Sequence, residues 1–401
     1  GAVLYWLQYQ GGAQKAAPCM PCCGQGVKPE YWAEKGGCTM ERCVIEAAAG
    51  RKKAKLVLKN AQVVNVFTKQ VEQADVAVEA GVIAGVGQYS GEEEVDCTGL
   101  YLCPGFVDAH IHVESTMAVP YEFARAVAMS GTTTVVADPH EIVNVCGAPA
   151  VEWLLKASEA LPVDIYWMMP SSVPATPFET NGAPFTAQEM APFAQMGPRV
   201  AGLGEVMCYP DVVAGTGEIY GKLALFAHKH IDGHAPGLSG KALAAYAAAG
   251  IETEHECTSF AEAKEKLAAG LAILVREGSA AKNLTAIVEG LLKEGLPTDR
   301  FLFCTDDKHL DDIAREGHIR WNVHQAVQLG MPVVDAICMA SYNAARVYGL
   351  KGVGAIAPGY RADIVLLDDW KQVHVHAVYK DGVPVEQKIA AARRVPAPAA
   401  L

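Results

Sequence analysis

The chain alternates short apolar segments with helical stretches between residues 101 and 350, and this alternation limits the fold more than any other feature. Strands that alternate with helices form parallel sheets, because each helix returns the chain to the start of the next strand. Eight such units in about 250 residues are the size expected of a (β/α)8 barrel. The eight segments read as strands are Cys103–His110, Thr133–Ala137, Asp164–Met169, Val200–Glu205, His230–His234, Ile251–His255, Leu271–Arg276 and Phe301–Asp306.

An open, doubly wound sheet is the alternative arrangement of the same units. No Gly-x-Gly-x-x-Gly motif follows the first strand, so dinucleotide binding has little support. On both sides of the central region the pattern changes to β-hairpins, one of them over residues 76–87 and another over 362–385. We therefore predict an α/β protein with a TIM-like barrel over 101–350 and a small β-sandwich domain composed of residues 40–100 and 351–388.

The two ends of the chain differ in composition from the rest. Residues 1–39 are rich in Gly, Cys and Pro and are expected to be a disordered extension, followed by a short helix at Glu41–Ala49. Cys19-x2-Cys22 and Cys38-x4-Cys43 offer a zinc knuckle as the alternative. Residues 389–401 are rich in Ala and Pro and are expected to form an unfolded tail.

Composition excludes several classes of function. The 401 residues carry 33 basic and 45 acidic side chains, a net charge of -12, which argues against binding of a nucleic-acid backbone. No apolar run reaches the roughly 18 residues of a membrane span. The first residues are a poor export signal, and seven cysteines are scattered through apolar segments. Reduced core thiols of this kind predict a cytoplasmic protein that has no membrane partner.

Metal-ligand side chains lie at the ends of the predicted strands, where barrel enzymes place their catalytic groups. One histidine at a strand end is ordinary, but a whole set is hard to reach by chance. In His110-Ile111-His112 the two imidazoles share one face of a strand. Imidazole with carboxylate suits Zn, Fe or Mn better than Mg or Ca, and a bridging carboxylate makes a binuclear centre plausible. The set is His110, His112, His140, Glu205, His234, His255 and Asp306, with Asp307 next to it.

The order of these residues resembles that of the amidohydrolase superfamily, and several stretches resemble its bacterial adenine deaminases. The similarity runs from about Glu41 to about Val385. The His-x-His motif alone is shared by many hydrolases, whereas the later motifs are more specific. The stretches concerned are Pro104–Ser115, Ala137–Ile142, Pro170–Thr176, Gly202–Met207, Ile231–Gly237, His255–Thr258, Arg276–Lys282 and Cys304–Asp307.

The resemblance implies two divalent metal ions, with Mn or Fe favoured and Zn as a further candidate. It implies His110 and His112 on one ion, His234 and His255 on the other, Glu205 as the bridge, and Asp306 as both ligand and proton shuttle. The implied reaction is the hydrolysis of adenine to hypoxanthine and ammonia in purine salvage. It needs a hydroxide nucleophile near neutral pH and a group that returns a proton to the leaving nitrogen.

Further residues are candidates for the substrate pocket. Glu114 is predicted to accept hydrogen bonds from a purine, or else to cap the following helix. Asp138 and His140 are predicted to act in catalysis or to orient a ligand, with a structural Asp–His pair as the alternative. Arg276, Glu277 and Ser279 are expected to line the purine pocket. His318 lies in the connection after the last strand, and His374 and His376 are interpreted as surface or packing residues.

The chain departs from the family pattern at its end, since the relatives carry a further C-terminal domain and this sequence stops at Leu401. Two alternatives to adenine deamination therefore stay open. One is another amidohydrolase that acts on a cyclic amide or amidine, and the other is a truncated, metal-binding barrel without activity. Barrel enzymes of this type often associate, so a homo-oligomer is a further expectation.

Overall fold

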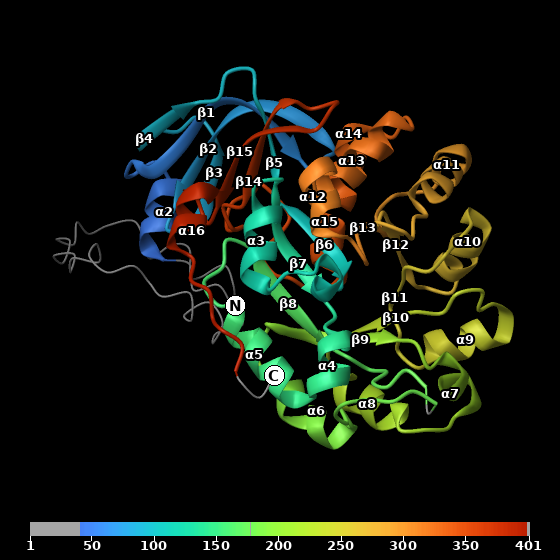
Figure 1. The fold of residues 1–401 in the computed structure, drawn as a ribbon. Helices are drawn as coiled ribbons and strands as arrows, with labels where there is room; N and C mark the ends of the chain where they lie inside the picture. Colours follow the sequence, from blue (N-terminus) through green and yellow to red (C-terminus); the bar gives the residue numbers. More distant parts are fainter. Residues whose placement is uncertain (1–40, 177, 399–401) are drawn as a thin grey trace, which may run out of the picture.

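A curled parallel sheet forms the centre of the molecule (Figure 1). The computed structural model describes residues 41–176 and 178–398. Its parallel strands are β6 (Phe106–Ile111), β7 (Thr132–Ala137), β8 (Asp164–Met169), β9 (Val200–Val206), β10 (His230–Gly233), β11 (Thr253–Glu254), β12 (Ala272–Arg276) and β13 (Phe301–Cys304). Strands β6 to β10 form one hydrogen-bonded run and β11 to β13 another.

Backbone hydrogen bonds join the two runs into a ring. Glu252 N donates to Ile231 O at 3.0 Å between β10 and β11. On the other side Asp306 N donates to His110 O at 2.9 Å, and His112 N donates to Asp306 O at 3.2 Å. The fold is thus a TIM-like barrel, and the open sheet is excluded. Strand β7 is buried along its whole length, as expected of a strand covered on both faces.

Helices surround the ring, and N-capping residues in the sequence mark where some of them begin. Thr186 and Glu189 form a reciprocal capping box at the start of α6, and Ser259 caps α10. The helices that follow β6 to β13 are α3 (Pro120–Ala128), α4 (His140–Cys146), α5 (Ala148–Ala157), α6 (Ala187–Ala194), α7 (Tyr209–Ala214), α8 (Ile219–Phe226), α9 (Gly240–Ala248), α10 (Phe260–Ala268), α11 (Leu284–Glu294), α12 (Leu310–Glu316), α13 (Ile319–Gln328), α14 (Val333–Met339) and α15 (Tyr342–Val347), with the 3-10 turn η1 (Val113–Thr116) after β6. No helix among the described residues is both long and apolar enough to cross a bilayer.

Strands from both flanks of the barrel form a second sheet (Figure 1). Strand β5 joins the flanks, because it pairs with β1 on one side and with β14 on the other. The hydrogen bonds make one continuous eight-stranded sheet, so the finer expectation of a two-sheet sandwich is not confirmed. The strands are β1 (Ala54–Asn65), β2 (Gln70–Glu79), β3 (Val82–Gly87), β4 (Gly91–Asp96), β5 (Tyr101–Pro104), β14 (Ile364–Asp369), β15 (His374–Lys380) and β16 (Val383–Pro384), with helix α2 (Arg42–Ala48) beside β3.

The predicted strand Cys103–His110 is in fact two strands, β5 in the flanking sheet and β6 in the barrel. Gly105 separates them where the chain crosses from one sheet to the other. A Cβ atom at Gly105 would lie 2.2 Å from Thr133 Oγ1, so only glycine fits this close approach. The predicted strand Ile251–His255 is also shorter than expected, since β11 holds only two residues.

A buried network of charges connects the flanking sheet to the barrel. Lys380 Nζ lies 2.5 Å from Asp164 Oδ2, at the start of β8, and 2.7 Å from Asp363 Oδ2. Arg361 Nη1 also lies 2.5 Å from Asp164 Oδ2. Burial alone would raise the pKa of Asp164, but Arg361 and Lys380 lower it to about 2. Both cations therefore hold this carboxylate ionised between the two sheets.

The C-terminal tail is more ordered than expected. Helix α16 (Val385–Ala391) continues past residue 389, where the tail was predicted to begin. Residues 392–398 have no helix or strand, but Trp153 Nε1 of α5 donates a hydrogen bond to Pro396 O at 3.2 Å. The predicted extension 1–39 lies outside the described residues, and so do three of the four cysteines of the zinc-knuckle alternative. The fourth, Cys43, is a free thiol in α2.

Candidate metal centre

Glu205, the next-to-last residue of β9, is the centre of the site. Its carboxylate is buried and faces four imidazole rings. Oε2 lies 2.6 Å from His234 Nδ1 and 3.2 Å from His255 Nε2. Oε1 lies 3.1 Å from His140 Nδ1 and 3.4 Å from His112 Nε2. Burial alone would raise the pKa of Glu205, but these imidazoles lower it well below its usual range, so the group is an anion.

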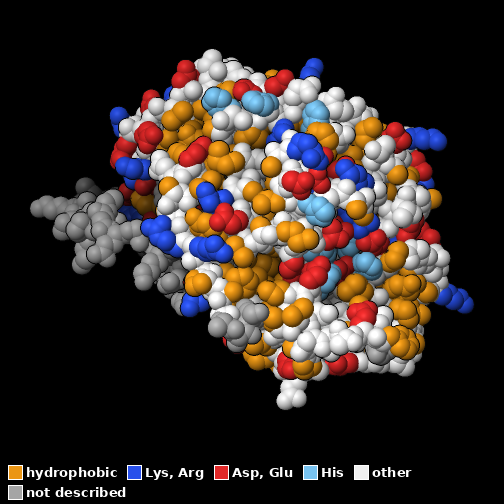
Figure 2. Space-filling model, viewed as in Figure 1, with side chains coloured by type: hydrophobic (Ala, Val, Ile, Leu, Met, Phe, Trp, Pro, Cys, Tyr) orange, Lys and Arg blue, Asp and Glu red, His pale blue; other side chains and the backbone are white. Residues whose placement is uncertain are grey.

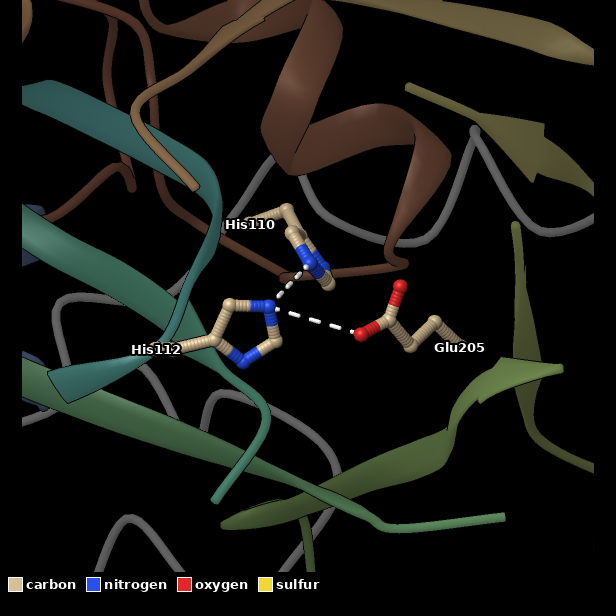
Figure 3. Close-up of side chains that lie close together, drawn as sticks. All are labelled: His110, His112 and Glu205. Carbon is tan, nitrogen blue, oxygen red and sulfur yellow. Dashed lines mark hydrogen bonds and ion pairs between the residues drawn. The ribbon is translucent and has the colours of Figure 1, made fainter. Parts of the chain in front are cut away.

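The two rings of the His-x-His motif point into the same space as Glu205 (Figure 3). Their Nε2 atoms are only 3.2 Å apart. His112 Nδ1 lies 2.8 Å from the backbone carbonyl oxygen of Asp138, which can only accept a hydrogen bond. That hydrogen bond places the proton of neutral His112 on Nδ1 and leaves the Nε2 lone pair directed toward His110 and Glu205. Fixing a ligand histidine through its other nitrogen is typical of metal sites.

Asp306 follows β13 and adds a second carboxylate. Its Oδ1 lies 3.0 Å from His112 Nε2 and 3.6 Å from His110 Nε2. Burial would raise the pKa of Asp306, but its contact with His112 and the nearby histidines hold it far below its usual range. The backbone of Asp306 has a φ of +57°, which is uncommon outside glycine but more readily adopted by Asp than by most residues.

The donor atoms divide into two sets that share Glu205. The groups that can hold an ion include His110, His112 and Glu205, as well as Glu205, His234 and His255. A further group, His110, His255 and Asp306, takes one histidine from each set. All six residues that the sequence predicted as ligands therefore meet at one place, and their nitrogen and carboxylate donors fit a divalent metal centre.

Asp138 and His140, also predicted for the site, both contact Glu205. Asp138 Oδ2 accepts a hydrogen bond from Glu205 N at 2.9 Å. Burial raises the pKa of Asp138 to about 6. Burial would lower the pKa of His140, but its contacts with Glu141 and Glu205 raise it to about 11. Asp138 therefore fixes the position of the Glu205 backbone through this hydrogen bond.

Gly204 is needed for this hydrogen bond, because a Cβ atom there would lie 2.1 Å from Asp138 Oδ2. We expect Gly204→Ala to displace the Asp138 carboxylate, to cost about 1–3 kcal/mol of stability, and to lower the bound metal. Denaturant unfolding and metal analysis measure both effects. Gly221→Ala is the control, because its nearest atom would be a methyl carbon at 3.2 Å. Full metal content in Gly204→Ala would contradict the role assigned to Asp138.

Glu114 lies on η1, and the sequence predicted for it either a contact with a purine or a cap on the following helix. Its Oε1 accepts a hydrogen bond from Ile142 N at 3.3 Å, in the first turn of α4. It therefore caps α4 and not the helix that follows it in sequence. Its Oε2 is buried without a hydrogen-bond partner. Burial and the neighbouring Glu141 raise the pKa of Glu114 to about 7. The substrate role of Glu114 stays a prediction.

Arg276 contacts Asp306 directly. Its Nη1 lies 2.6 Å from Asp306 Oδ2, and its Nη2 lies 3.0 Å from Glu256 Oε2. The guanidinium is therefore held between two carboxylates at the edge of the metal centre. Its predicted contact with substrate stays a prediction, but the structure shows that it positions Asp306.

Glu277 and Ser279, the other two residues predicted to line the pocket, have partners of their own. Glu277 Oε1 lies 3.0 Å from Lys282 Nζ. Ser279 Oγ donates to Asp312 and accepts from His309 N at 2.9 Å. These contacts tie the loop after β12 to the start of α12.

Two buried aspartates support the ligands and were missed by the sequence analysis. Asp232 Oδ2 lies 3.7 Å from His110 Nδ1, while its Oδ1 accepts from Thr253 Oγ1 at 2.6 Å and from Tyr348 at 2.8 Å. Asp108 Oδ1 accepts a hydrogen bond from His110 N at 3.2 Å, and its Oδ2 lies 3.0 Å from His318 Nε2. A signal was present, since each aspartate lies two residues before a ligand histidine and so shares its face of the strand.

Known proteins resemble this chain over most of its length. The model of the amidohydrolase family matches residues 101–385. Two curated relatives, each named adenine deaminase, are 53% identical over 339 residues (Desulfitobacterium hafniense strain Y51) and 48% identical over 341 residues (Kosmotoga olearia). Both alignments cover 84% of this chain, which spans 59% of either relative's length. The crystal structure of an enamidase shares the fold, with a TM-score of 0.62 and 19% identity over 83% of this chain and 96% of that one.

Proposed function

The chain belongs to the amidohydrolase family, and from that premise we propose that it hydrolyses adenine to hypoxanthine and ammonia. The observation that carries the proposal is the position of Glu205 between two sets of metal donors. The choice of adenine is supported by the likeness to proteins named adenine deaminase. Because the chain spans only 59% of their length, the activity of the whole relatives is a proposal for this chain.

The proposed centre holds two divalent ions, with Mn or Fe favoured and Zn a further candidate, because its donors are imidazoles and carboxylates. His110, His112 and Asp306 are assigned to one ion and His234 and His255 to the other, with Glu205 between them. Bound there, such ions supply the Lewis acidity that makes a hydroxide nucleophile available near neutral pH.

The residues of the chain then move the proton. Asp306 takes the proton of the attacking water as the new C–O bond forms at the carbon that bears the exocyclic amine. It returns a proton to the nitrogen as the C–N bond breaks, so that ammonia leaves and not the amide anion. Arg276 holds Oδ2 of Asp306 and so leaves Oδ1 directed toward His112.

Glu114 is proposed to recognise the purine through Oε2, whose burial without a partner leaves it free to accept an N–H hydrogen bond. We expect Glu114→Gln to keep the cap on Ile142 but to weaken this contact by about 1.5–3 kcal/mol, or about 10–150-fold in kcat/KM for adenine. Steady-state kinetics measure the change, and Glu122→Gln on the exposed face of α3 is the control. An unchanged kcat/KM would remove Glu114 from the substrate pocket.

One assay tests the proposed reaction. The metal-free protein is loaded with Mn or Fe(II), adenine is added, and ammonia release and the ultraviolet change to hypoxanthine are followed together. We expect stoichiometric appearance of both products. Metal binding without turnover would favour the metal-binding barrel without activity. Turnover of another cyclic amide or amidine in place of adenine would favour a different amidohydrolase.

Three further predictions belong to the same proposal. We propose a cytoplasmic location, which agrees with the eight free cysteines among the described residues. The division into a barrel over 101–350 and a small β domain from 40–100 and 351–388 is retained as a proposal, although β5 pairs within the flanking sheet, between β1 and β14. A homo-oligomer is retained as a prediction that measurement of the mass in solution tests.

A further inference from the structure

Three potential metal ligands lie together on the flanking sheet, outside the barrel. His374 and His376 of β15 both face Asp368 of β14, and we call these three residues the surface triad. His374 Nδ1 lies 2.6 Å from Asp368 Oδ1, and His376 Nδ1 lies 3.8 Å from Asp368 Oδ2. Their side chains are 67%, 53% and 39% exposed, in the order His374, His376, Asp368. Figure 2 shows histidine side chains at the surface over this sheet as well as near the barrel centre.

Irregular strand pairing brings the triad together. Leu366 pairs with Ala377 and Leu367 with Val375, so His376 is an extra residue in β15. Leu367 then pairs with Val375 and Asp369 with His374, so Asp368 is an extra residue in β14. Bulges of this kind redirect side chains and are frequent next to functional sites. Here the two bulged residues are two of the three triad members.

A simple ion pair explains only part of this arrangement. It accounts for the short contact of His374 with Asp368, but not for the second imidazole that faces the other oxygen of the same carboxylate. Both imidazoles face the same carboxylate across the bulged pair of strands, so His374 and His376 can bind one ion together with Asp368. Two imidazole nitrogens and one carboxylate oxygen are ligands that Zn²⁺, Ni²⁺ and Cu²⁺ prefer, whereas Mg²⁺ and Ca²⁺ prefer oxygen alone.

The neighbouring charges leave room for a cation. Asp369 is adjacent, and its Oδ1 accepts backbone hydrogen bonds from Lys371 and Gln372 in the turn between the strands. Arg320 lines the same surface hollow as His374, and its guanidinium donates to the carbonyl oxygens of Val373 and Glu316. We propose that the surface triad is a third metal site, which binds one Zn²⁺, Ni²⁺ or Cu²⁺ ion apart from the two ions of the barrel centre.

Binding at the triad has a structural consequence. Strands β14 and β15 contribute one and two ligands respectively, so a bound ion would clamp the hairpin that they form. An ion that binds only the folded state stabilises it by mass action. We therefore expect Zn²⁺ to raise the unfolding temperature through the triad in addition to any effect at the barrel centre.

The experiment counts ions in the metal-free full-length chain titrated with Zn²⁺. We expect the double variant His374→Gln with His376→Gln to bind one equivalent fewer than the wild type. Its binding of ions at the barrel centre should be unchanged. An untagged wild-type protein should also be retained on immobilised Ni²⁺ and the double variant much less. His228→Gln, which changes another exposed histidine, is the matched control.

A second variant guards against an indirect effect of the double substitution. Asp368→Asn keeps the shape of the side chain and should also weaken the third equivalent. Equal ion counts and equal retention of wild type and double variant would overturn the proposal, as would an equal loss in His228→Gln. Neither readout involves adenine, so failure of the triad and failure of the proposed hydrolysis are separate results.

Discussion

Glu205→Gln is expected to abolish hydrolysis and to release metal from the barrel centre. Glu205 Oε2 lies within 3.2 Å of both His234 Nδ1 and His255 Nε2, and Oε1 lies 3.1 Å from His140 Nδ1. The neutral amide has one acceptor oxygen in place of two and no charge to bind a cation. Bound ions contribute several kcal/mol of transition-state stabilisation, so their loss should lower kcat by about a thousandfold or more.

Metal content and kinetics together test this expectation. Glu289→Gln on the exposed face of α11 is the matched control, because it removes a charge of the same kind far from any ligand. We expect the control to keep its full metal content and rate. Glu205→Gln protein that is folded by circular dichroism and still binds both ions with wild-type affinity would disprove the bridging role.

Lys380→Met is expected to produce the largest loss of stability, because it leaves the buried carboxylate of Asp363 without its closest cation. The Lys380 side chain is 2% exposed and contacts both Asp164 and Asp363. Removal of one partner from a buried ion pair costs about 3–5 kcal/mol. Arg361 remains next to Asp164, and that carboxylate is one-third exposed, so the lower part of this range is the better expectation.

Denaturant unfolding measures the effect of Lys380→Met, and Lys241→Met at an exposed position of α9 is its control. A third variant identifies the cause. Lys380→Met combined with Asp363→Asn removes one of the carboxylates left without its partner and should recover part of the loss. If the double variant is no more stable than Lys380→Met, the loss comes from packing and not from charge.

Local pattern was enough to predict which side chains lie together at the end of the barrel. In β6 the alternation of side chains places His110 and His112 on one face, and strand-end positions place Glu205, His234, His255 and Asp306 near them. Each inference needs only the direction of a strand and the rule that parallel strands end on the same side of the barrel. All six residues therefore meet as predicted.

Pairing between distant strands could not be predicted from the sequence. The contact of Arg276 with Asp306 was not predicted, because it depends on the register of β12 on β13, which pairs Arg276 with Cys304. The surface triad was missed for the same reason, since it depends on two bulges in the pairing of β14 with β15. Gly105 did carry a local signal, because a glycine inside a strand pattern often marks a close approach.

The closure of the barrel couples folding to the chemistry. The hydrogen bonds that join the first and last strands of the ring are made by the backbones of His110, His112 and Asp306. Segments almost 200 positions apart in the chain must therefore meet before the first metal ligand set exists, and contacts of such long range form slowly. Ions that bind these side chains only in the folded state would also stabilise the pairing of the first and last strands, which closes the barrel. Removal of the bound ions by a chelator should therefore increase hydrogen exchange first along β6 and β13, because the pairing that closes the barrel would become weaker.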